Sequence, residues 1–310
     1  MQLHVVHETT YHYAPAVTQA LHLAHLRPRH GATQQLLAHT LQVQPEPRQC
    51  EVAQDPFGNT RTFFSLPFTH ERLRVCADSL VQTHPPCPAP AGLPWESVRE
   101  RMRYRQGAAF ESAAEFGFAS PYIPRHEDFA AYARPSFSAG RPLMEAAREL
   151  TSRIHADFEY AAQATDAGTP ALESLRLRRG VCQDFAHVMI GCLRSLGLAA
   201  RYVSGYLLTK PPPGQPRLVG ADASHAWVSV WSPGEPGCEW FDLDPTNDRA
   251  AGEDYVTLAL GRDYADISPL RGVILGGEHH EPQVAVTIEP VDSTPPQAPP
   301  ATGGMTALPA

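Results

Sequence analysis

The chain lacks the features that would place it in a membrane or on nucleic acid. Its 310 residues contain no run of about 18 apolar residues, which is the length that a bilayer-spanning helix needs. The net charge of −8 at pH 7 argues against a general nucleic-acid binder. Residues 1–8 also lack the basic-then-apolar pattern of a secretory signal. We therefore expect neither a membrane partner nor a nucleic-acid partner.

Regular cysteine and metal motifs are absent as well. The six cysteines, at positions 50, 76, 87, 182, 192 and 238, form no CxxC pair and have no regular spacing. This spacing predicts reduced thiols in the cytoplasm, because disulfide frameworks and zinc knuckles use regular cysteine patterns. There is no EF-hand loop and no HExxH motif, so we expect no metal and no cofactor. The histidines at 22, 25 and 30 have no carboxylate at the spacing that a metal site needs. Residues 278–281 (EHHE) are more typical of a solvated turn than of a metal site.

The distribution of turns and apolar residues predicts an α+β fold. Residues 1–85 contain short stretches in which apolar and polar residues alternate, and turn signals separate these stretches. This pattern indicates a β-rich, sandwich-like N-terminal domain. Residues 86–142 begin with a proline-rich linker and continue with bridging helices. Residues 143–290 form the expected core of helices packed on an antiparallel sheet. Residues 291–310 contain little charge and few large apolar groups, which predicts a disordered proline-rich tail.

Within the core, apolar periodicity predicts helices and strands. Apolar residues at helical spacing predict helices from position 143, from position 170 toward Gly180, and from just after Gly180 to Gly197. Strands are expected near 200–208, 225–231, 239–245 and 283–289.

Cys182 is the most informative residue in the chain. It follows Gly180 at the predicted start of an apolar helix. A helix start carries unpaired backbone N–H groups and the positive end of the helix dipole, and both favour a thiolate. This is one of the environments in which cysteine becomes a nucleophile. Cys192 lies in the apolar stripe of the same helix and is interpreted as a core residue.

Two predicted strands supply an imidazole and a carboxylate. Residues 224–231 and 239–244 flank a dense turn signal, so we expect a hairpin with His225 opposite position 244 or 245. Cross-strand neighbours on one face lie about 5 Å apart at Cβ, so the His225 and Asp244 side chains would meet. Asp242 is the rival carboxylate, but it lies further from this end of the hairpin. Cysteine attacks a carbonyl, histidine transfers the proton and aspartate orients the imidazole.

Several separate segments resemble the core of the bacterial transglutaminase-like proteins. These segments are residues 180–187 (GVCQDFAH), 200–206 (ARYVSGY), 220–227 (GADASHAW), 243–247 (LDPTN) and 261–272 (GRDYADISPLRG). The segments 7–13 (HETTYHY), 26–29 (LRPR) and 55–59 (DPFGN) resemble the N-terminal domain of the same subgroup. The resemblance spans roughly residues 1–290. It implies a papain-like core in which Cys182 is the nucleophile, His225 the base and Asp244 the orienting carboxylate.

The family resemblance leaves the reaction open, because one fold hosts several chemistries. We expect cleavage or exchange of amide bonds in peptides or proteins through a Cys182 thioester. Water as acceptor gives a cysteine protease or amidase, whereas an amine acceptor gives a protein-glutamine transglutaminase. Hydrolysis is favoured because no amine-binding acid cluster is identifiable. The alternatives are a non-catalytic binding or assembly module, or a non-peptide acyltransferase. The acyltransferase would use an activated acyl donor such as an acyl-CoA, and Arg176, Arg178 and Arg179 would have to bind the phosphate groups of that donor.

Three other residues are weaker candidates for substrate binding. Tyr160 could supply a second oxyanion donor beside the backbone N–H of Cys182. Asp184 could bind a substrate amine or cap the helix. Trp227 could line an acyl groove or belong to the core, and the core is the favoured interpretation.

Overall fold

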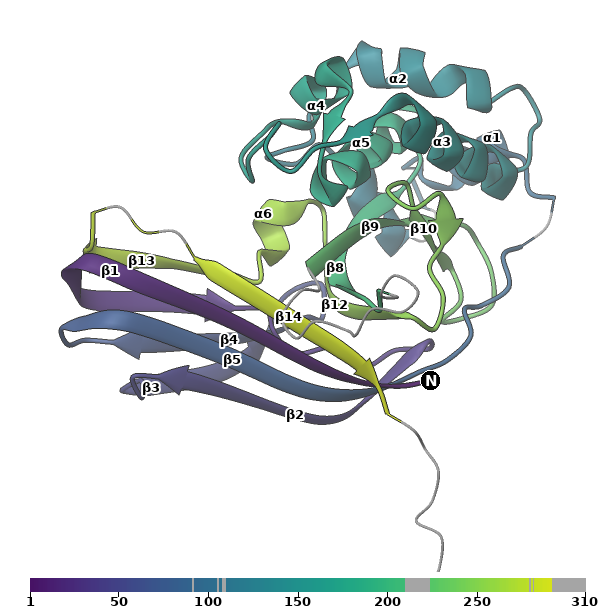
Figure 1. Cartoon of the computed structure of the whole chain (residues 1–310). Helices are drawn as coiled ribbons and strands as arrows, with labels where there is room; N and C mark the ends of the chain where they lie inside the picture. The colour runs from purple at the N-terminus through teal and green to yellow at the C-terminus, as the bar shows by residue number, and fades with distance from the viewer. Residues whose placement is uncertain are drawn as a thin grey trace, which may run out of the picture.

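The computed structural model describes residues 1–90, 92–104, 106–107, 110–209, 224–278, 280 and 282–291. A strand-rich N-terminal sheet, a second smaller sheet and a layer of helices follow one another across the molecule (Figure 1). The predicted α+β class with a strand-rich N-terminal part is thereby confirmed. All but the first residue of the predicted proline-rich tail, 291–310, lies outside the described residues.

The N-terminal sheet is organised about one long strand, β1 (Gln2–Ala24). Five of its strands follow the order β2-β5-β1-β4-β3, and two further strands also pair with β1. Alternate residues at the start of β1 are buried, among them Leu3 and Val5, so one face of the sheet is apolar. The other four strands are β2 (Gln34–Gln44), β3 (Gln49–Gln54), β4 (Thr60–Leu66) and β5 (His70–Thr83).

The two remaining strands of this sheet come from the C-terminal end of the described chain. Both β13 (Leu270–Gly276) and β14 (Gln283–Pro290) pair antiparallel with β1. We expected the strand near 283–289 to belong to the core, and this assignment was wrong. Val286 and Ile288 are fully buried among the N-terminal apolar residues. Alternation along a strand predicts that it has an apolar face, but not which sheet will cover that face.

The second sheet carries the core. Its five strands follow the order β11-β10-β9-β8-β12, and every pairing is antiparallel. Its strands are β8 (Ala200–Leu207), β9 (Ser224–Trp231), β10 (Trp240–Asp244), β11 (Arg249–Ala250) and β12 (Tyr255–Gly261). Short strands β6 (Glu159–Tyr160) and β7 (Arg179–Gly180) form a separate parallel pair. The predicted strands near 200–208, 225–231 and 239–245 are therefore confirmed, whereas β12 was not predicted.

Helices cover one face of this second sheet, and the N-terminal sheet covers the other (Figure 1). Ala226 and Val228 of β9 pack among the helices, whereas Tyr206 and Val256 pack among residues of the N-terminal sheet. The helices are α1 (Trp95–Arg101), α2 (Glu127–Ala133), α3 (Leu143–Asp157), α4 (Ala171–Leu177), α5 (Cys182–Ser195) and α6 (Tyr264–Ile267), with 3-10 turns η1 (Ser112–Gly117) and η2 (Arg134–Ser136). None of the described helices is long and apolar enough to cross a bilayer.

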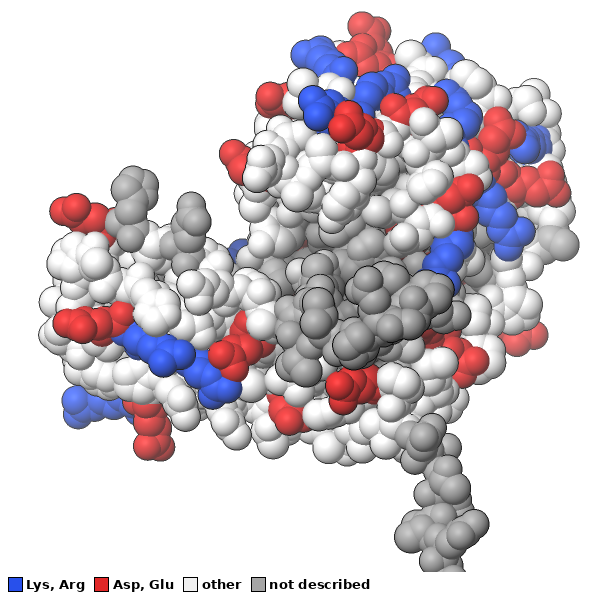
Figure 2. All heavy atoms as spheres, viewed as in Figure 1, with Lys and Arg blue, Asp and Glu red and all other residues white. Residues whose placement is uncertain are grey.

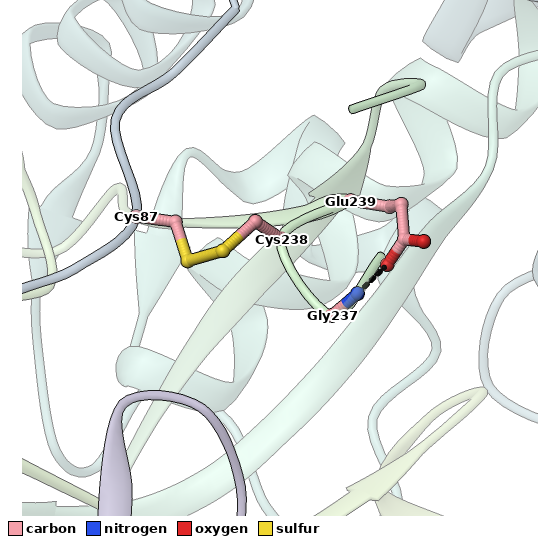
Figure 3. Close-up of a disulfide and its surroundings, with 4 residues drawn as sticks. All are labelled: Cys87, Gly237, Cys238 and Glu239. Atoms are coloured by element: carbon pink, nitrogen blue, oxygen red, sulfur yellow. Dashed lines mark hydrogen bonds between the residues drawn. A yellow bond between two sulfur atoms is a disulfide. The ribbon is translucent and has the colours of Figure 1, made fainter. Parts of the chain in front are cut away.

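A disulfide joins Cys87 to Cys238 (Figure 3). Cys87 lies in the proline-rich segment that leaves β5, and Cys238 lies in the turn between β9 and β10. The prediction of six reduced thiols is wrong for this pair, because residues 151 positions apart meet only through the tertiary fold. Cysteine usage therefore no longer supports a reducing compartment. The cytoplasmic location stays a prediction.

Candidate active site

Cys182 is the first residue of α5, where the sequence predicted a helix start. The buried carboxylate of Asp184 accepts hydrogen bonds from the Val181 backbone N–H at 2.8 Å, the Ser174 hydroxyl at 2.7 Å and the Thr165 hydroxyl at 2.6 Å. These bonds join the turn before Cys182 to α4 and to the loop that precedes α4. Asp184 therefore fixes the position of the cysteine by capping its helix, and its carboxylate lies inside the protein.

The β9–β10 hairpin brings His225 near Asp244 in a register that differs from the predicted one. Leu243 pairs with Val228, so the same register places position 244 opposite Trp227. The predicted hairpin had His225 itself opposite position 244 or 245, and this register is wrong. The turn between the strands fixes the register, and its length could not be converted into a pairing from sequence alone. A diagonal neighbour two residues away is still within reach of long side chains.

His225 connects the thiol to the carboxylate. Its Nε2 atom lies 2.7 Å from the Asp244 Oδ2 atom. The Cys182 side chain interacts with the same imidazole and helps to raise its pKa, and because Nε2 faces Asp244, we assign Nδ1 to the thiol. The His225 side chain is 11% exposed and that of Asp244 is fully buried. The structure thus brings the three predicted site residues together, with His225 interacting with both Cys182 and Asp244.

Two residues that the sequence analysis did not assign complete the surroundings of Asp244. The Oδ2 atom also accepts hydrogen bonds from Asn247 Nδ2 and from the Tyr255 hydroxyl, both at 2.7 Å. The Oδ1 atom accepts the Thr246 backbone N–H at 2.8 Å. Asn247 closes a segment that carried the family resemblance, so its position was visible in the sequence. Tyr255 lies on the unpredicted strand β12, and nothing near it in the sequence marked it.

These contacts set the charge states of the site. Burial would lower the pKa of His225, but its hydrogen bonds to Asp244 and Cys182 and the negative charges there raise it to about 9. Burial would raise the pKa of Asp244, but bonds from His225, Asn247 and Tyr255 lower it. Burial, followed by the Asp244 charge, raises the pKa of Tyr255 well above its usual value, so Tyr255 stays a donor. Near neutral pH the site holds an imidazolium against a carboxylate.

The weaker candidates occupy different positions. Tyr160 is 58% exposed and pairs with Gly180, two residues before Cys182, and it interacts electrostatically with Cys182. Trp227 is fully buried and donates its indole N–H to Asp242 Oδ2 at 3.1 Å. The core interpretation of Trp227 thus agrees with its position. Asp242 binds the indole, and Asp244 is the carboxylate that contacts the imidazole.

A buried tyrosine that sequence reasoning missed also lies near the thiol. Tyr202 on β8 interacts electrostatically with Cys182, and burial, reinforced by the Cys182 charge, raises its pKa well above the ordinary value. The ring of His187, one turn along α5, lies 5.0 Å from the Tyr202 ring. Residues 200–206 carried part of the family resemblance, but nothing in the sequence marked an interaction between Tyr202 and the cysteine.

The arginines that precede Cys182 are occupied by other contacts. Arg176 pairs with Asp128 at 3.3 Å, and Arg179 pairs with Glu159 at 3.0 Å. The Arg178 guanidinium lies 4.2 Å above the Tyr132 ring. On the face shown in Figure 2, positive and negative side chains intermingle over the helical layer. These three arginines therefore resemble a charged helix end more than an open phosphate site.

Among the described residues, no group of three or more His, Cys, Asp or Glu is arranged to hold a metal ion. Of the sequence 278–281, His279 and Glu281 lie outside the described part of the chain. His22 is buried and stacks on Phe64 with ring centroids 5.2 Å apart, while His25 lies 3.7 Å from Asp55. The expectation that the protein needs no metal and no cofactor stays a prediction.

Comparison with known families and proteins gives matches along most of the chain. Residues 3–82 match the bacterial transglutaminase-like N-terminal region, and residues 130–245 match the transglutaminase-like superfamily. An uncharacterized protein of Mycobacterium tuberculosis is 42% identical over 295 residues, which covers 93% of this chain and 92% of that protein. An uncharacterized protein of Mycobacterium leprae is 31% identical, with 93% and 98% covered.

Two further similarities concern proteins that carry a description. A protein-glutamine gamma-glutamyltransferase of Pseudomonas aeruginosa is 34% identical over 127 residues, covering 38% of this chain and 19% of that protein. The solved structure of a candidate cysteine protease from Cytophaga hutchinsonii has a TM-score of 0.70 at 20% identity, with 95% of this chain and 93% of that chain covered. This structural likeness extends to both sheets and the helical layer. The chain therefore belongs to the transglutaminase-like superfamily and carries the bacterial transglutaminase-like N-terminal region.

Proposed function

We propose that the protein is a thiol-dependent acyl-transfer enzyme that acts on amide bonds of peptides or proteins. One observation carries this proposal: His225 lies 2.7 Å from the Asp244 carboxylate and at the same time interacts with the Cys182 side chain. An imidazole held in this way stabilises a thiolate and keeps a proton ready for the leaving group. Asp244 fixes the orientation of the ring, and its own position is fixed by Asn247 and Tyr255.

The proposed reaction has two steps. In the first, the Cys182 thiolate attacks the carbonyl carbon of a carboxamide or peptide bond, and the His225 imidazolium gives its proton to the departing amine. The carbon–nitrogen bond breaks and a thioester remains on Cys182. In the second, neutral His225 takes a proton from water or from an acceptor amine, which attacks the thioester and releases the cysteine.

The oxyanion that forms during attack needs a donor near Cys182. The backbone N–H of Cys182 lies in the first turn of α5, where helical geometry leaves N–H groups without an intrahelical acceptor. We assign this group as the first oxyanion donor. Tyr160, beside the thiol, is the proposed second contact to substrate.

The acceptor decides whether the enzyme hydrolyses or cross-links. Water leads to a cysteine protease or amidase, and hydrolysis is the outcome we favour from the sequence. The name of the Pseudomonas relative, protein-glutamine gamma-glutamyltransferase, supports the amine branch instead. A glutamine-containing peptide incubated with and without a primary amine separates these branches. Ammonia release without amine incorporation indicates hydrolysis, and incorporation indicates transfer.

The first test requires no substrate. Iodoacetamide labelling of Cys182, followed by peptide mass spectrometry, is compared in wild type and His225→Ala, with the exposed free cysteine Cys50 as internal reference. At pH 6.5 we expect Cys182 to react about tenfold faster than Cys50, because free thiols are largely protonated there. This advantage should disappear in His225→Ala.

Equal labelling of Cys182 and Cys50, indifferent to His225, would contradict the proposal and favour a non-catalytic binding module. Fast labelling together with turnover of an acyl-CoA, but of no peptide, would instead indicate a non-peptide acyltransferase. Since Arg176, Arg178 and Arg179 already contact other side chains, we do not expect that outcome.

A further inference from the structure

A cavity of about 560 Å³ lies behind the hairpin that carries His225 and Asp244. Its walls come from the loop 29–34 after β1, the segment 84–89 after β5, and the strands β10 and β12. Neither Cys182 nor His225 lines it. The Cys87–Cys238 disulfide connects two of these walls (Figure 3). The cavity is therefore separate from the candidate active site, and it is framed by parts of the chain that are tied together covalently.

Arg201 on β8 lines this cavity, and its Nε atom has no hydrogen-bond partner among the described residues. Its guanidinium lies 4.0 Å above the ring of Trp240, which also lines the cavity. Its Nε atom is buried and has no hydrogen-bond acceptor among the described residues. A guanidinium offers five N–H donors in a rigid plane, and buried donors are almost always satisfied. An arginine that lies on an aromatic ring and whose buried Nε has no acceptor among the described residues can therefore bind an acceptor from outside the protein.

Two further arginines line the same cavity. Arg29 donates to the Phe57 carbonyl at 3.0 Å and to Asn59 Oδ1 at 2.7 Å, so its side chain is fixed. Arg148 reaches the cavity from the exposed side of α3.

Three guanidinium groups line the cavity, and among the described lining residues one carboxylate, that of Asp242, lies with them. Asp242 already accepts the Trp227 indole N–H. Burial lowers the pKa of Arg201 to about 10; the Asp242 and Glu239 charges oppose this shift and the Arg29 charge adds to it. Among the described lining residues, three arginines therefore face one carboxylate, and Glu239 is a second negative charge near Arg201.

We infer that this cavity binds a small organic anion whose carboxylate or phosphate group contacts Arg201 and Arg148. Guanidinium groups match the planar geometry of carboxylate and phosphate oxygens and bind them in pairs. The other walls include the apolar side chains of Trp240, Phe241 and Met144, so the rest of the ligand should be an aromatic or aliphatic body. The volume falls in the range of small-molecule sites.

The cavity also touches the surroundings of the candidate active site through one side chain. Tyr255 lines the cavity, and its hydroxyl donates to Asp244 at 2.7 Å. A ligand in the cavity would therefore lie one side chain away from Asp244. An effect of this ligand on the activity of Cys182 rests on the proposed function. Binding of the ligand does not.

Isothermal titration calorimetry with defined probes tests the binding. Phenyl phosphate and phenylacetate carry the two candidate anionic groups, and benzyl alcohol is a neutral probe of similar size; all are titrated at constant ionic strength. We expect wild type to bind one or both anions at submillimolar concentration and to bind benzyl alcohol at least tenfold more weakly. Comparison of the two anions tells a phosphate site from a carboxylate site.

Variants locate the bound anion. Arg201→Gln and Arg148→Gln should each weaken anion binding about tenfold, because each removes a charged hydrogen-bond donor. Arg103→Gln, at an exposed arginine in a second hollow, is the matched control and should bind as wild type does. Arg148→Gln alters an exposed residue, so it tests the site even if Arg201→Gln fails to fold.

Two results would overturn the inference. One is the absence of binding of either anion to folded wild type up to about 10 mM, an affinity too weak for a built site. The other is equal loss of binding in Arg148→Gln and Arg103→Gln, which would indicate general charge attraction. Because calorimetry measures binding directly, failure here is distinguishable from failure of the proposed reaction at Cys182.

Discussion

The Asp244 carboxylate shows how much of the candidate site depends on single residues. One of its oxygens accepts hydrogen bonds from His225, Asn247 and Tyr255, and the side chain has no contact with solvent. A buried carboxylate needs such donors, since an uncompensated charge is expensive away from water. The same bonds restrict the rotation of Asp244 and thereby the orientation of the imidazole.

Tyr255→Phe should slow the chemistry of Cys182 without unfolding the protein. The change removes one hydrogen bond from Asp244 and retains the ring that packs in the core. We expect alkylation at pH 6.5 and turnover to fall about three- to tenfold, since one such bond contributes about 1 kcal/mol. Tyr132→Phe is the matched control, because the Tyr132 hydroxyl also donates to a carboxylate, that of Asp157, at a distance of 2.8 Å. This pair does not belong to the candidate active site. Equal effects of the two variants would show that Tyr255 acts only through general stability.

The charge of His225 gives a pH prediction with a definite sign. Its pKa in the folded protein is raised from 6.5 to about 9, so folding favours the protonated ring. The stability that this contributes is fully present below pH 6.5 and is lost as the pH rises through about 9. Turnover should fall over the same alkaline range, because the leaving amine then lacks a proton donor.

Proton NMR of histidine rings labelled at Cε1 measures this titration. We expect His225 to titrate near 9 in wild type and closer to its ordinary value in Asp244→Asn. His187 is an internal control, since burial, followed by the charge of Arg194, lowers its pKa to about 3 and it should stay neutral throughout. A His225 titration near 6.5 in wild type would contradict the proposed ion pair.

At the scale of elements, the start of α5 depends on a glycine as well as on its capping carboxylate. A Cβ atom at Gly180 would collide with the side chain of Asp184. Gly180→Ala should therefore displace the cap and lower the free energy of unfolding by about 1–3 kcal/mol. Gly31→Ala is the control, because a Cβ there meets nothing within 4 Å.

Urea unfolding curves give both stabilities, and iodoacetamide labelling reports the position of Cys182. In Gly180→Ala we expect slower labelling together with the lower stability. A Gly180→Ala variant as stable as Gly31→Ala would show that the turn before α5 can relax around the added methyl group.

Elements with strong local signals could be predicted from sequence, whereas their partners could not. α5 was predicted from its apolar spacing and from Gly197, whose φ of +81° ends the helix. The strands around His225 and Asp244 followed from alternation and turn residues. The register between them and the position of Tyr255 did not follow, because these depend on turn geometry and on the packing of β12. The assignment of β14 to the core failed for the same reason.

At the scale of the whole molecule, the Cys87–Cys238 disulfide links segments that precede and follow the helical layer. It closes a loop of 151 residues, and long loops gain most from closure in the unfolded chain. Cys87→Ser should lower the free energy of unfolding by about 2–5 kcal/mol under oxidising conditions. Cys50→Ser, at an exposed free cysteine, should leave it unchanged.

Urea unfolding with and without dithiothreitol measures this contribution. Reduction should bring wild type to the stability of Cys87→Ser and should not affect that variant further. A wild type that is indifferent to dithiothreitol would mean that the two cysteines are unpaired in solution.

The pairing of β14 with β1 has a consequence for synthesis of the chain. Leu3 pairs with Pro290 and Thr10 with Gln283, so partners in one sheet leave the ribosome almost a whole chain apart. Until β14 appears, that edge of β1 has unpaired backbone groups, which are a template for pairing with other chains. Because β14 follows the core in the chain, the N-terminal sheet can be completed only after the ribosome has synthesised the core. Nascent chains should therefore depend on chaperones that shield this edge.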